Sequence, residues 1–370
     1  MKFIVLKKNL KDGLRAIERI TDQNSNLPIL KNFLIESFDN KIKISATNLE
    51  LAVTSYISGK IIENGSLTIP LHFFNSIINN LQTEKINLES ENEKLTIKTD
   101  NYQAEIKGIK KDEFPIIPKI ENEKFYLEIN NSILKNSLSS IVNSTTNENK
   151  PELNGVLFDY QDTLIKLAAT DTFRLSEKTI FNTQYNSNIE KKFKTIIPTK
   201  TIQEVIRGLQ FEENNNTSIF FDQNQILFKN ESIEIISRLI NGEFPDYSQI
   251  IPKKFETEIT LNNNELVNAV KLASVFSDRL NEVKIIIKEN AKNIEVYSAG
   301  SNLGENKYLI PAKISGSPME IIFNWRYLLD GIKNLTSENI FLGINNNNKP
   351  ALLKASEEIS WFYILMPIKS

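Results

Sequence analysis

Apolar residues recur along the chain in six stripes that have the spacing of one helix face. In each stripe, an apolar residue is followed by others four and seven positions later. This pattern is typical of an amphipathic helix packed on a core. Their first residues lie 60 to 68 positions apart, which indicates a repeat of six units. The stripes are Leu10-Leu14-Ile17, Phe74-Ile78-Leu81, Leu134-Leu138-Ile141, Ile202-Ile206-Leu209, Leu266-Val270-Ala273 and Leu328-Ile332-Leu335.

Short alternating runs lie between these helices. Residues 41–44, 94–97 and 226–228 are short, rich in β-branched or aromatic side chains and bounded by turn residues, as β-strands usually are. One helix and several strands therefore recur six times. The sequence predicts an α+β fold in which each repeat contributes one helix to antiparallel sheets.

A second signature recurs at about twice this period. FPIIPKI at 114–120 ends the first third of the chain, and FPDYSQIIPK at 244–253 ends the second. The strand ends match as well, as Ala46-Thr47-Asn48, Ala169-Thr170-Asp171 and Ser298-Ala299-Gly300. We therefore expect three similar domains of two repeats each, at 1–122, 123–253 and 254–370.

The helix face opposite each stripe carries no acid. Positions two before and five after the first stripe residue lie about 160° and 140° away from it, so they point away from the core. A solvated face normally mixes both signs. Because Asp12, Glu204 and Asp330 occupy a neighbouring position, the basic face is narrow. The twelve occupants are Lys8, Arg15, His72, Asn79, Ser132, Ser139, Lys200, Arg207, Asn264, Lys271, Arg326 and Lys333.

The net charge limits how the chain could bind nucleic acid. It has 44 Lys and Arg against 46 Asp and Glu, so no overall positive field attracts phosphates. Any binding must come from charge gathered on one face, such as the helix face described above. Contacts to phosphates position a protein on DNA without reading its bases. This favours loose binding that ignores sequence.

Composition also excludes several classes of protein. With 40% apolar and 24% charged residues, the chain resembles an ordinary globular protein. The absence of cysteine excludes disulfides, zinc fingers and thiol catalysis. No apolar run reaches the roughly 18 residues of a membrane span, and the N-terminal run is too short for a signal peptide. We expect a cytoplasmic protein that does not contact membranes.

Residues that carry catalysis are scarce. The one histidine, His72, stands beside Phe73 and Phe74 with no acid or nucleophile motif nearby. No GxGxxG or phosphate-binding loop occurs. The pair Asp112 and Glu113 is typical of a solvated turn. We therefore expect no enzyme, no cofactor and no metal. Two alternatives stay open: a peptide-binding scaffold that does not encircle DNA, and a hydrolase with an unrecognised carboxylate site.

Several motifs, in order along the whole chain, resemble the β subunit of bacterial DNA polymerase III, the family of bacterial sliding clamps. The resemblance implies a head-to-tail dimer that forms a six-domain ring around double-stranded DNA without sequence preference. It also implies binding to the replicative polymerase, the clamp loader and repair proteins. The motifs are MKFIV at the start, Leu27-Pro28-Ile29-Leu30, Ala46-Thr47-Asn48-Leu49-Glu50-Leu51, Leu153-Asn154-Gly155, Ala169-Thr170-Asp171 with Arg174-Leu175, Phe244-Pro245-Asp246-Tyr247 and Met366-Pro367.

The resemblance also assigns residues to sites. It adds Asn24 and Asn147 to the basic helix residues Lys8, Arg15, Lys200, Arg207, Lys271, Arg326 and Lys333 as expected DNA contacts. It implies a peptide-binding pocket made of Leu153, Thr170, Thr172, Phe173, Arg174, Leu175, Pro245, Gln249, Ile250, Tyr327, Ile364, Leu365, Met366, Pro367 and Ile368. Thr172-Phe173 stands where the family usually has Gly-His, and Gln249 replaces a usual basic residue, so partner preference is expected to differ.

Two apolar surfaces are expected to join the copies of the dimer. The strand around Tyr102, Ala104 and Ile106 would meet the helix end at Val275 and Phe276 of a second copy. These apolar residues would otherwise be exposed at an edge, which proteins normally avoid. A head-to-tail contact of this kind closes into a ring only if the rotation per subunit is right, so the interface must be heterologous and used twice.

Overall fold

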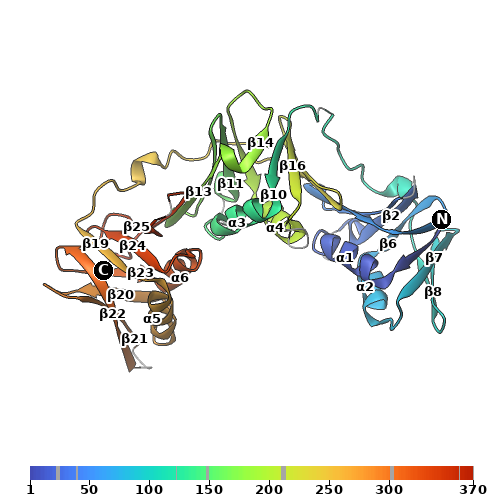
Figure 1. Cartoon of the computed structure of the whole chain (residues 1–370). Coiled ribbons are helices and arrows are strands. Elements are labelled where there is room, and N and C mark those ends of the chain that lie inside the picture. The colour runs from blue at the N-terminus through green and yellow to red at the C-terminus, as the bar shows by residue number, and fades with distance from the viewer. Residues whose placement is uncertain are drawn as a thin grey trace. The chain divides into compact units, whose positions relative to one another are not determined.

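The structure is a computed structural model that describes residues 1–21, 26–38, 41–121, 123–146, 150–209, 214–300, 304–357 and 359–369. It forms two compact units, both drawn in Figure 1. Unit 1 comprises Met1–Lys135, Thr183–Glu190 and Lys200–Leu239. Unit 2 comprises Asn136–Asn182, Lys191–Thr199 and Ile240–Ser370. The central third of the chain is thus shared between the two units.

Each of the six apolar stripes forms an α-helix, as the sequence predicts. The stripe residues are buried with one exception. Ile206 is only half-buried, because Val205 points into the core in its place. Positions three and four after Ile202 both lie near the core side of a helix, so spacing alone does not decide between them. The helices are α1 Lys7–Ile17, α2 Leu71–Asn80, α3 Asn131–Val142, α4 Thr199–Gly208, α5 Asn263–Val275 and α6 Trp325–Lys333.

Unit 1 contains two antiparallel sheets. The order is β5-β1-β7-β8-β9 in one sheet and β14-β10-β16-β17-β18-β4-β3-β2-β6 in the other. The three predicted strand segments lie in β3, β8 and β17, which confirms them. The strands of unit 1 are β1 Lys2–Leu6, β2 Asn32–Phe38, β3 Lys41–Thr47, β4 Leu51–Ile57, β5 Gly59–Glu63, β6 Gly65–Pro70, β7 Lys85–Glu91, β8 Lys94–Lys98, β9 Gln103–Lys107, β10 Leu127–Asn130, β14 Tyr185–Ser187, β16 Asn216–Phe221, β17 Gln225–Lys229 and β18 Ile233–Arg238.

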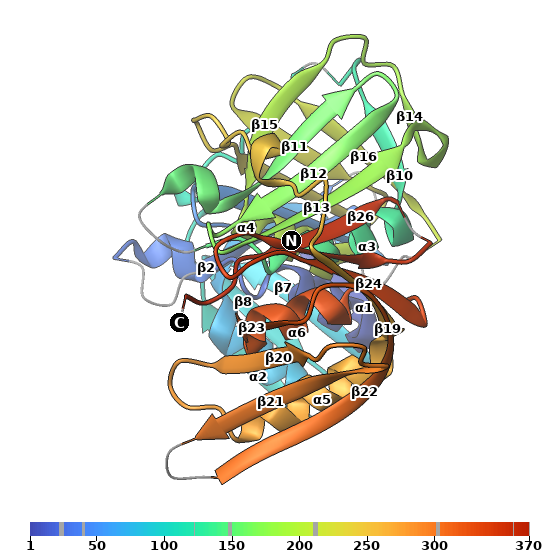
Figure 2. The same ribbon diagram turned by 90° about the vertical axis from the view of Figure 1, so that its left-hand side faces the viewer.

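Unit 2 contains one continuous antiparallel sheet, in the order β15-β11-β12-β13-β26-β25-β24-β19-β22-β21-β20-β23. Its last strands cover α5 and α6, as Figure 2 shows for β20, β21 and β22. The strands of unit 2 are β11 Gly155–Gln161, β12 Leu164–Thr170, β13 Arg174–Phe181, β15 Phe193–Pro198, β19 Thr257–Asn262, β20 Glu282–Ile287, β21 Asn293–Gly300, β22 Gly304–Gly316, β23 Met319–Asn324, β24 Asn339–Ile344, β25 Ala351–Ala355 and β26 Trp361–Leu365.

Sheets run without a break from one third of the chain into the next. In unit 1, β4 of the first third pairs with β18 of the second, with Val53 opposite Ile235. In unit 2, β13 pairs with β26, with Leu175 opposite Ile364. Backbone ladders therefore join the thirds, in addition to side-chain packing. The expected α+β fold with antiparallel sheets is confirmed.

The two repeated Phe-Pro signatures form connectors that lie on the faces of these sheets. In unit 1, Phe114 is buried, and Ile120 packs with Ala52 and Ile236 in a small core cluster. In unit 2, the Tyr247 hydroxyl donates a hydrogen bond of 2.6 Å to the buried carboxylate of Glu177 on β13. Each signature thus fastens a connector to the strands beneath it.

Candidate functional site

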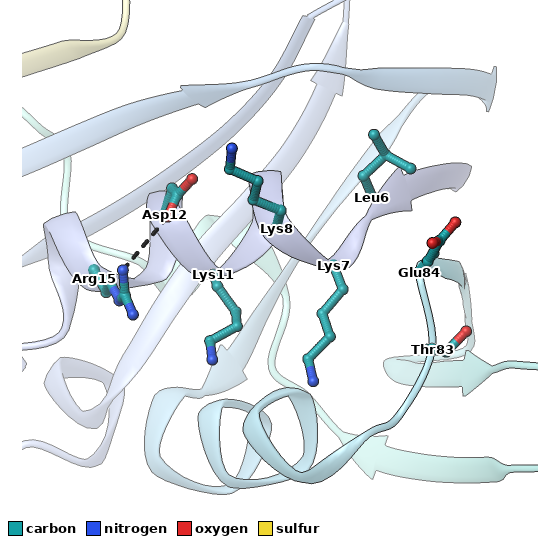
Figure 3. A pocket seen from close by; sticks show the side chains of 8 residues that line it. All are labelled: Leu6, Lys7, Lys8, Lys11, Asp12, Arg15, Thr83 and Glu84. Atoms are coloured by element: carbon teal, nitrogen blue, oxygen red, sulfur yellow. Dashed lines mark ion pairs between the residues drawn. The ribbon is translucent and has the colours of Figure 1, made fainter. Parts of the chain in front are cut away.

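A basic cavity lies beside the first helix of unit 1. It has a volume of about 590 Å³ and is lined by Leu6, Lys7, Lys8, Lys11, Asp12, Arg15, Thr83 and Glu84. Figure 3 shows that Lys7 and Lys11 extend from one side of α1 and Lys8 from another. Sequence reasoning missed Lys7 and Lys11 as lining residues, although the run KKNLKDGLR already gathers four cations on the first turns of α1.

Lys7 has a structural role within this cavity. Its Nζ donates to the carbonyl oxygens of Leu81 and, at 3.4 Å, of Asn79. These carbonyls lie at the end of α2, where the helix dipole favours a cation and no backbone donor follows. Lys7 therefore joins α1 to α2, whereas Lys8 lies exposed.

The predicted helix face is on the surface in both units. None of its twelve residues is buried, and Lys8, Arg15, Lys200, Lys271, Arg326 and Lys333 are all exposed. Within the described residues, no carboxylate lies within ion-pair distance of these cations except Asp12, whose Oδ1 is 3.7 Å from Arg15 Nη1. The face is unevenly charged along the chain, because α2 and α3 contribute only His72, Asn79, Ser132 and Ser139.

The three acids next to this face each have an internal basic partner. Asp12 pairs with Arg15, Glu204 pairs with Arg207, and Asp330 Oδ2 accepts a 2.6 Å hydrogen bond from Arg174. Their negative charge is therefore partly compensated at close range. The remaining lysines can act on solvent and on anions with little opposition from their own helices.

Arg207 differs from the other predicted DNA contacts. Its guanidinium is mostly covered, and it pairs with Glu204 and donates a 3.1 Å hydrogen bond to the carbonyl of Ala16. Glu18 lies 3.9 Å away. Burial raises the pKa of Glu204, and the attraction of Arg207 opposes that rise. Arg207 is thus held within unit 1 by contacts with α1. Asn24 and Asn147 lie outside the described residues.

The residues of the predicted peptide pocket begin at a tight turn in unit 2. Thr170 ends β12, and its hydroxyl donates to the carbonyl of Arg174 at 2.7 Å while accepting from the backbone of Thr172. The Asp171 carboxylate accepts from the backbone amides of Phe173 and Arg174. Thr172 has a φ of 75°, in the left-handed region that a β-branched residue rarely adopts. This turn presents Phe173, which is 56% exposed, to solvent.

Arg174 is held by contacts within the protein. Its Nε donates to Asp171 at 2.8 Å, its Nη1 donates to Asp330 on α6, and its guanidinium lies 4.2 Å from the ring centre of Tyr327. The side chain is only 10% exposed. Arg174 therefore connects the turn to helix α6 through its Nε and Nη1 donors.

Successive side chains of strand β26 point to opposite faces of the sheet, so the predicted pocket residues on this strand do not share one face. Leu365 packs in the core cluster beneath the sheet together with Tyr363. Ile364 lies opposite Leu175, so it belongs to the other face. The amide of Met366, just after the strand, donates to the Phe173 carbonyl at 2.8 Å. Leu153, Thr170 and Pro367 are buried, Tyr327 and Ile368 are half-buried, and Pro245, Gln249 and Ile250 are exposed.

The predicted dimer surfaces are only partly exposed: Tyr102 and Val275 are exposed, whereas Ala104, Ile106 and Phe276 are half-buried. Tyr102, Ala104 and Ile106 lie on or next to β9, the last strand of its sheet, which leaves one side of that strand unpaired. In unit 2, Val275 at the end of α5 is 65% exposed. Leu272 and Leu280, which sequence reasoning missed, add to this apolar surface. The signal for Leu272 was available, because it is an apolar residue on α5 outside the core stripe.

Comparisons with known proteins agree along the whole chain. Models of the DNA polymerase III beta subunit match in order: the N-terminal domain at residues 1–118, the central domain at 128–246 and the C-terminal domain at 248–369. The beta sliding clamp of Synechococcus elongatus is 25% identical over 375 residues, covering 100% of this chain and 99% of the relative. That of Bacillus subtilis is 26% identical over 383 residues, covering 100% of both.

Solved structures show the same fold. The crystal structure of the DNA polymerase sliding clamp from Bacillus subtilis has a TM-score of 0.93 at 25% identity, covering 100% of this chain and 99% of that one. The DNA polymerase III beta subunit from Thermotoga maritima, at 24% identity, has a TM-score of 0.90 over 100% and 99% of the two chains. The chain belongs to the family of the DNA polymerase III beta subunit, the sliding clamps.

No helix in the described part of the chain is long and apolar enough to cross a membrane. Among the same residues, no group of three or more His, Asp or Glu side chains is placed to hold a metal ion.

Proposed function

We propose that this chain is a non-enzymatic sliding clamp, two copies of which close head to tail into a ring around double-stranded DNA. The observation that carries the proposal is the exposed, acid-free helix face, whose neighbouring acids all have internal basic partners. A positive surface that meets phosphates but has no means of reading bases suits a protein that slides. We place the clamp in the cytoplasm.

Three domains at 1–122, 123–253 and 254–370 would supply six domains to the ring. The first boundary falls in the interval between family matches at 119–127, which supports it, whereas the central and C-terminal matches meet at 247, before the second proposed boundary. Two repeats per domain would then contribute twelve helices to the inner wall of the dimer. Lys8, Arg15, Lys200, Lys271, Arg326 and Lys333 would face DNA, together with Asn24 and Asn147. Arg207 would contribute less than the lysines, because Glu204 compensates its charge.

Partners would dock at the turn that carries Phe173. An extended peptide from the replicative polymerase, the clamp loader or a repair protein would place its apolar side chains near Leu175, Ile364 and Met366. Large apolar anchors in a concave site dominate such recognition. Arg174 would act by holding the turn, and Phe173 would favour peptides with Phe or Leu by stacking on a Phe ring or packing against a Leu side chain.

The charge of the helix face provides the test. Lys8→Glu combined with Lys200→Glu should shorten retention on circular DNA and lower the slope of log affinity against log salt by roughly one unit for each lost contact. Lys292→Glu, in an exposed turn of unit 2, is the matched control and should leave the slope unchanged. If the double variant keeps the wild-type slope, the helix face does not meet DNA.

A further inference from the structure

The turn of the predicted peptide site occurs a second time, in unit 1. The Thr47 hydroxyl donates to the Leu51 carbonyl at 3.1 Å and accepts from the amide of Leu49. The Asn48 side chain accepts from the amides of Glu50 and Leu51. Leu49 has a φ of 77°, close to the 75° of Thr172. Residues 47–51 thus reproduce the hydrogen bonds of the turn at 170–174 that involve the backbone, whereas the bond from Arg174 Nε to Asp171 has no counterpart.

The strands around this turn correspond as well. Leu51 pairs with Ser237 and Ala52 with Ile236, in the places where Arg174 pairs with Leu365 and Leu175 with Ile364. The amide of Arg238 donates to the Glu50 carbonyl at 2.9 Å, as that of Met366 does to Phe173. Both turns are therefore joined in the same way to a strand from the following third of the chain.

The two Phe-Pro connectors, one in each unit, also correspond to each other. Pro115 and Ile116 belong to the first Phe-Pro signature, and Pro245 and Ile250 belong to the second, which has four additional residues between them. Ile116 is 95% exposed, whereas Ile117 and Ile120 of the same connector pack against a small core cluster. Ile250, a predicted pocket residue, is also exposed. Single exposed aliphatic side chains are normal on monomer surfaces, so Ile116 bears on binding only through the groove that it lines.

A groove is present where these parts meet in unit 1. It has a volume of about 330 Å³, and the turn, the connector and β18 all contribute to its lining. Leu49 and Ile116 expose apolar surface there, and Glu50 and Arg238 form an exposed ion pair of 3.6 Å. The lining residues are Thr47, Leu49, Glu50, Leu51, Ala52, Pro115, Ile116, Pro118, Gln225, Ile236, Ser237 and Arg238.

We propose that this groove is a second peptide-binding site, which takes an extended segment of a partner protein through one large apolar side chain. The inference rests on the proposed function, because the class of ligand comes from the pocket proposed at Thr170–Leu175. Ala52, which stands in the place of Leu175, lines the groove and packs with Ile120 and Ile236. Leu51 replaces Arg174, so the turn here is held without a guanidinium. The exposed Glu50–Arg238 ion pair presents a carboxylate that can accept hydrogen bonds and a guanidinium that can donate them to the backbone of a bound peptide.

A synthetic acetylated pentapeptide, Gln-Ala-Leu-Leu-Phe amide, provides the probe, and calorimetric titration into the full chain gives the stoichiometry. Wild type should bind two peptides per chain. Met366→Asp should leave one site, as should Ile116→Asp, and the double variant should leave none. Ile359→Asp, at an Ile that is 82% exposed and outside both grooves, is the matched control and should keep two sites. Circular dichroism should show an unchanged fold in Ile116→Asp, because that side chain has few contacts to lose.

The outcomes separate this inference from the proposed function. If wild type binds one peptide and Met366→Asp binds none, the groove in unit 1 is not a site, while the pocket in unit 2 stands. If Met366→Asp has no effect and Ile116→Asp removes binding, the groove stands and the proposed pocket fails. Methyl NMR of Met366→Asp gives a direct check: the Ile116 δ-methyl signal should shift on peptide addition. No shift at saturating peptide would overturn the inference.

Discussion

At the scale of single residues, the two repeated turns carry backbone strain at Leu49 and Thr172. Both have φ near +75°, where side chains with a branched or bulky Cβ are disfavoured and Asn is tolerated. The hydrogen bonds of each turn hold these residues in place. Neither residue type reveals this strain, because neither position carries the Gly or Asn that normally marks a left-handed residue; the one sign is that Thr172 stands where the family usually has Gly.

Thr172→Asn should relieve part of that strain. We expect the free energy of unfolding to rise by up to about 1 kcal/mol, since Asn adopts the left-handed region at lower cost and the amide of residue 172 keeps its bond to Thr170. Urea denaturation provides the measurement. Thr183→Asn, at an exposed threonine without a positive φ, should show no such gain. A loss of stability in Thr172→Asn would show that the threonine side chain has a contact that offsets the strain.

Residue contacts also mark the limit of sequence reasoning about the sites. Periodicity correctly placed Lys8, Lys200 and Lys333 on the surface, because a helix face follows from spacing alone. The pairing of Arg207 with Glu204, three positions earlier on the same helix, also follows from spacing. Periodicity could not reveal that Arg207 contacts Ala16 or that Arg174 is held by Asp330, because these partners lie far apart in the sequence and only the folded chain brings them together.

At the scale of elements, the connector of unit 2 is anchored by one hydroxyl. Tyr247 donates to Glu177, a carboxylate that is 4% exposed and that also lies 3.4 Å from Lys166. Burial raises the pKa of Tyr247 above its ordinary value of 10.0, and the charge of Glu177 acts in the same direction. The connector's attachment therefore depends on the protonated phenol.

Tyr247→Phe should lower the free energy of unfolding by about 1 to 2 kcal/mol at neutral pH, because a buried carboxylate loses a donor. The raised pKa also fixes the pH dependence. The stabilisation from the phenol is complete below about pH 10, and it is lost as the pH rises towards the folded-state pKa. Wild type should thus lose stability above pH 10 more steeply than Tyr247→Phe. Parallel slopes for the two proteins would contradict this account. Tyr297→Phe, which affects an exposed hydroxyl beside Glu305, is the control.

The C-terminal end of α5 offers a test of the dimer. Val275→Asp places a charge on a surface that we propose is buried against β9 of a second copy, so monomers should replace dimers in analytical ultracentrifugation. Because Val275 is exposed in the single chain, this substitution should not unfold the protein, so misfolding would not explain the monomers. Ile359→Asp is the matched control and should stay dimeric. A dimer that survives Val275→Asp would place the interface elsewhere.

At the scale of the whole molecule, the fold was predictable because one pattern recurs. Six stripes with a common spacing, separated by strand runs, indicate repeats of one helix and several strands, and the structure has these elements. The pairing of β4 with β18 and of β13 with β26 was not predictable. Strand alternation defines which face is buried, but it does not choose a partner strand from another third of the chain.

The central claim is that the protein holds DNA by encircling it. The most direct measurement is gel filtration of the loaded protein on a nicked circular duplex at high salt, before and after a restriction enzyme linearises the circle. A closed ring should stay with the circle despite screening of its phosphate contacts, and it should leave when free ends appear. Equal retention on circular and linear DNA, or equal loss from both, would contradict the account.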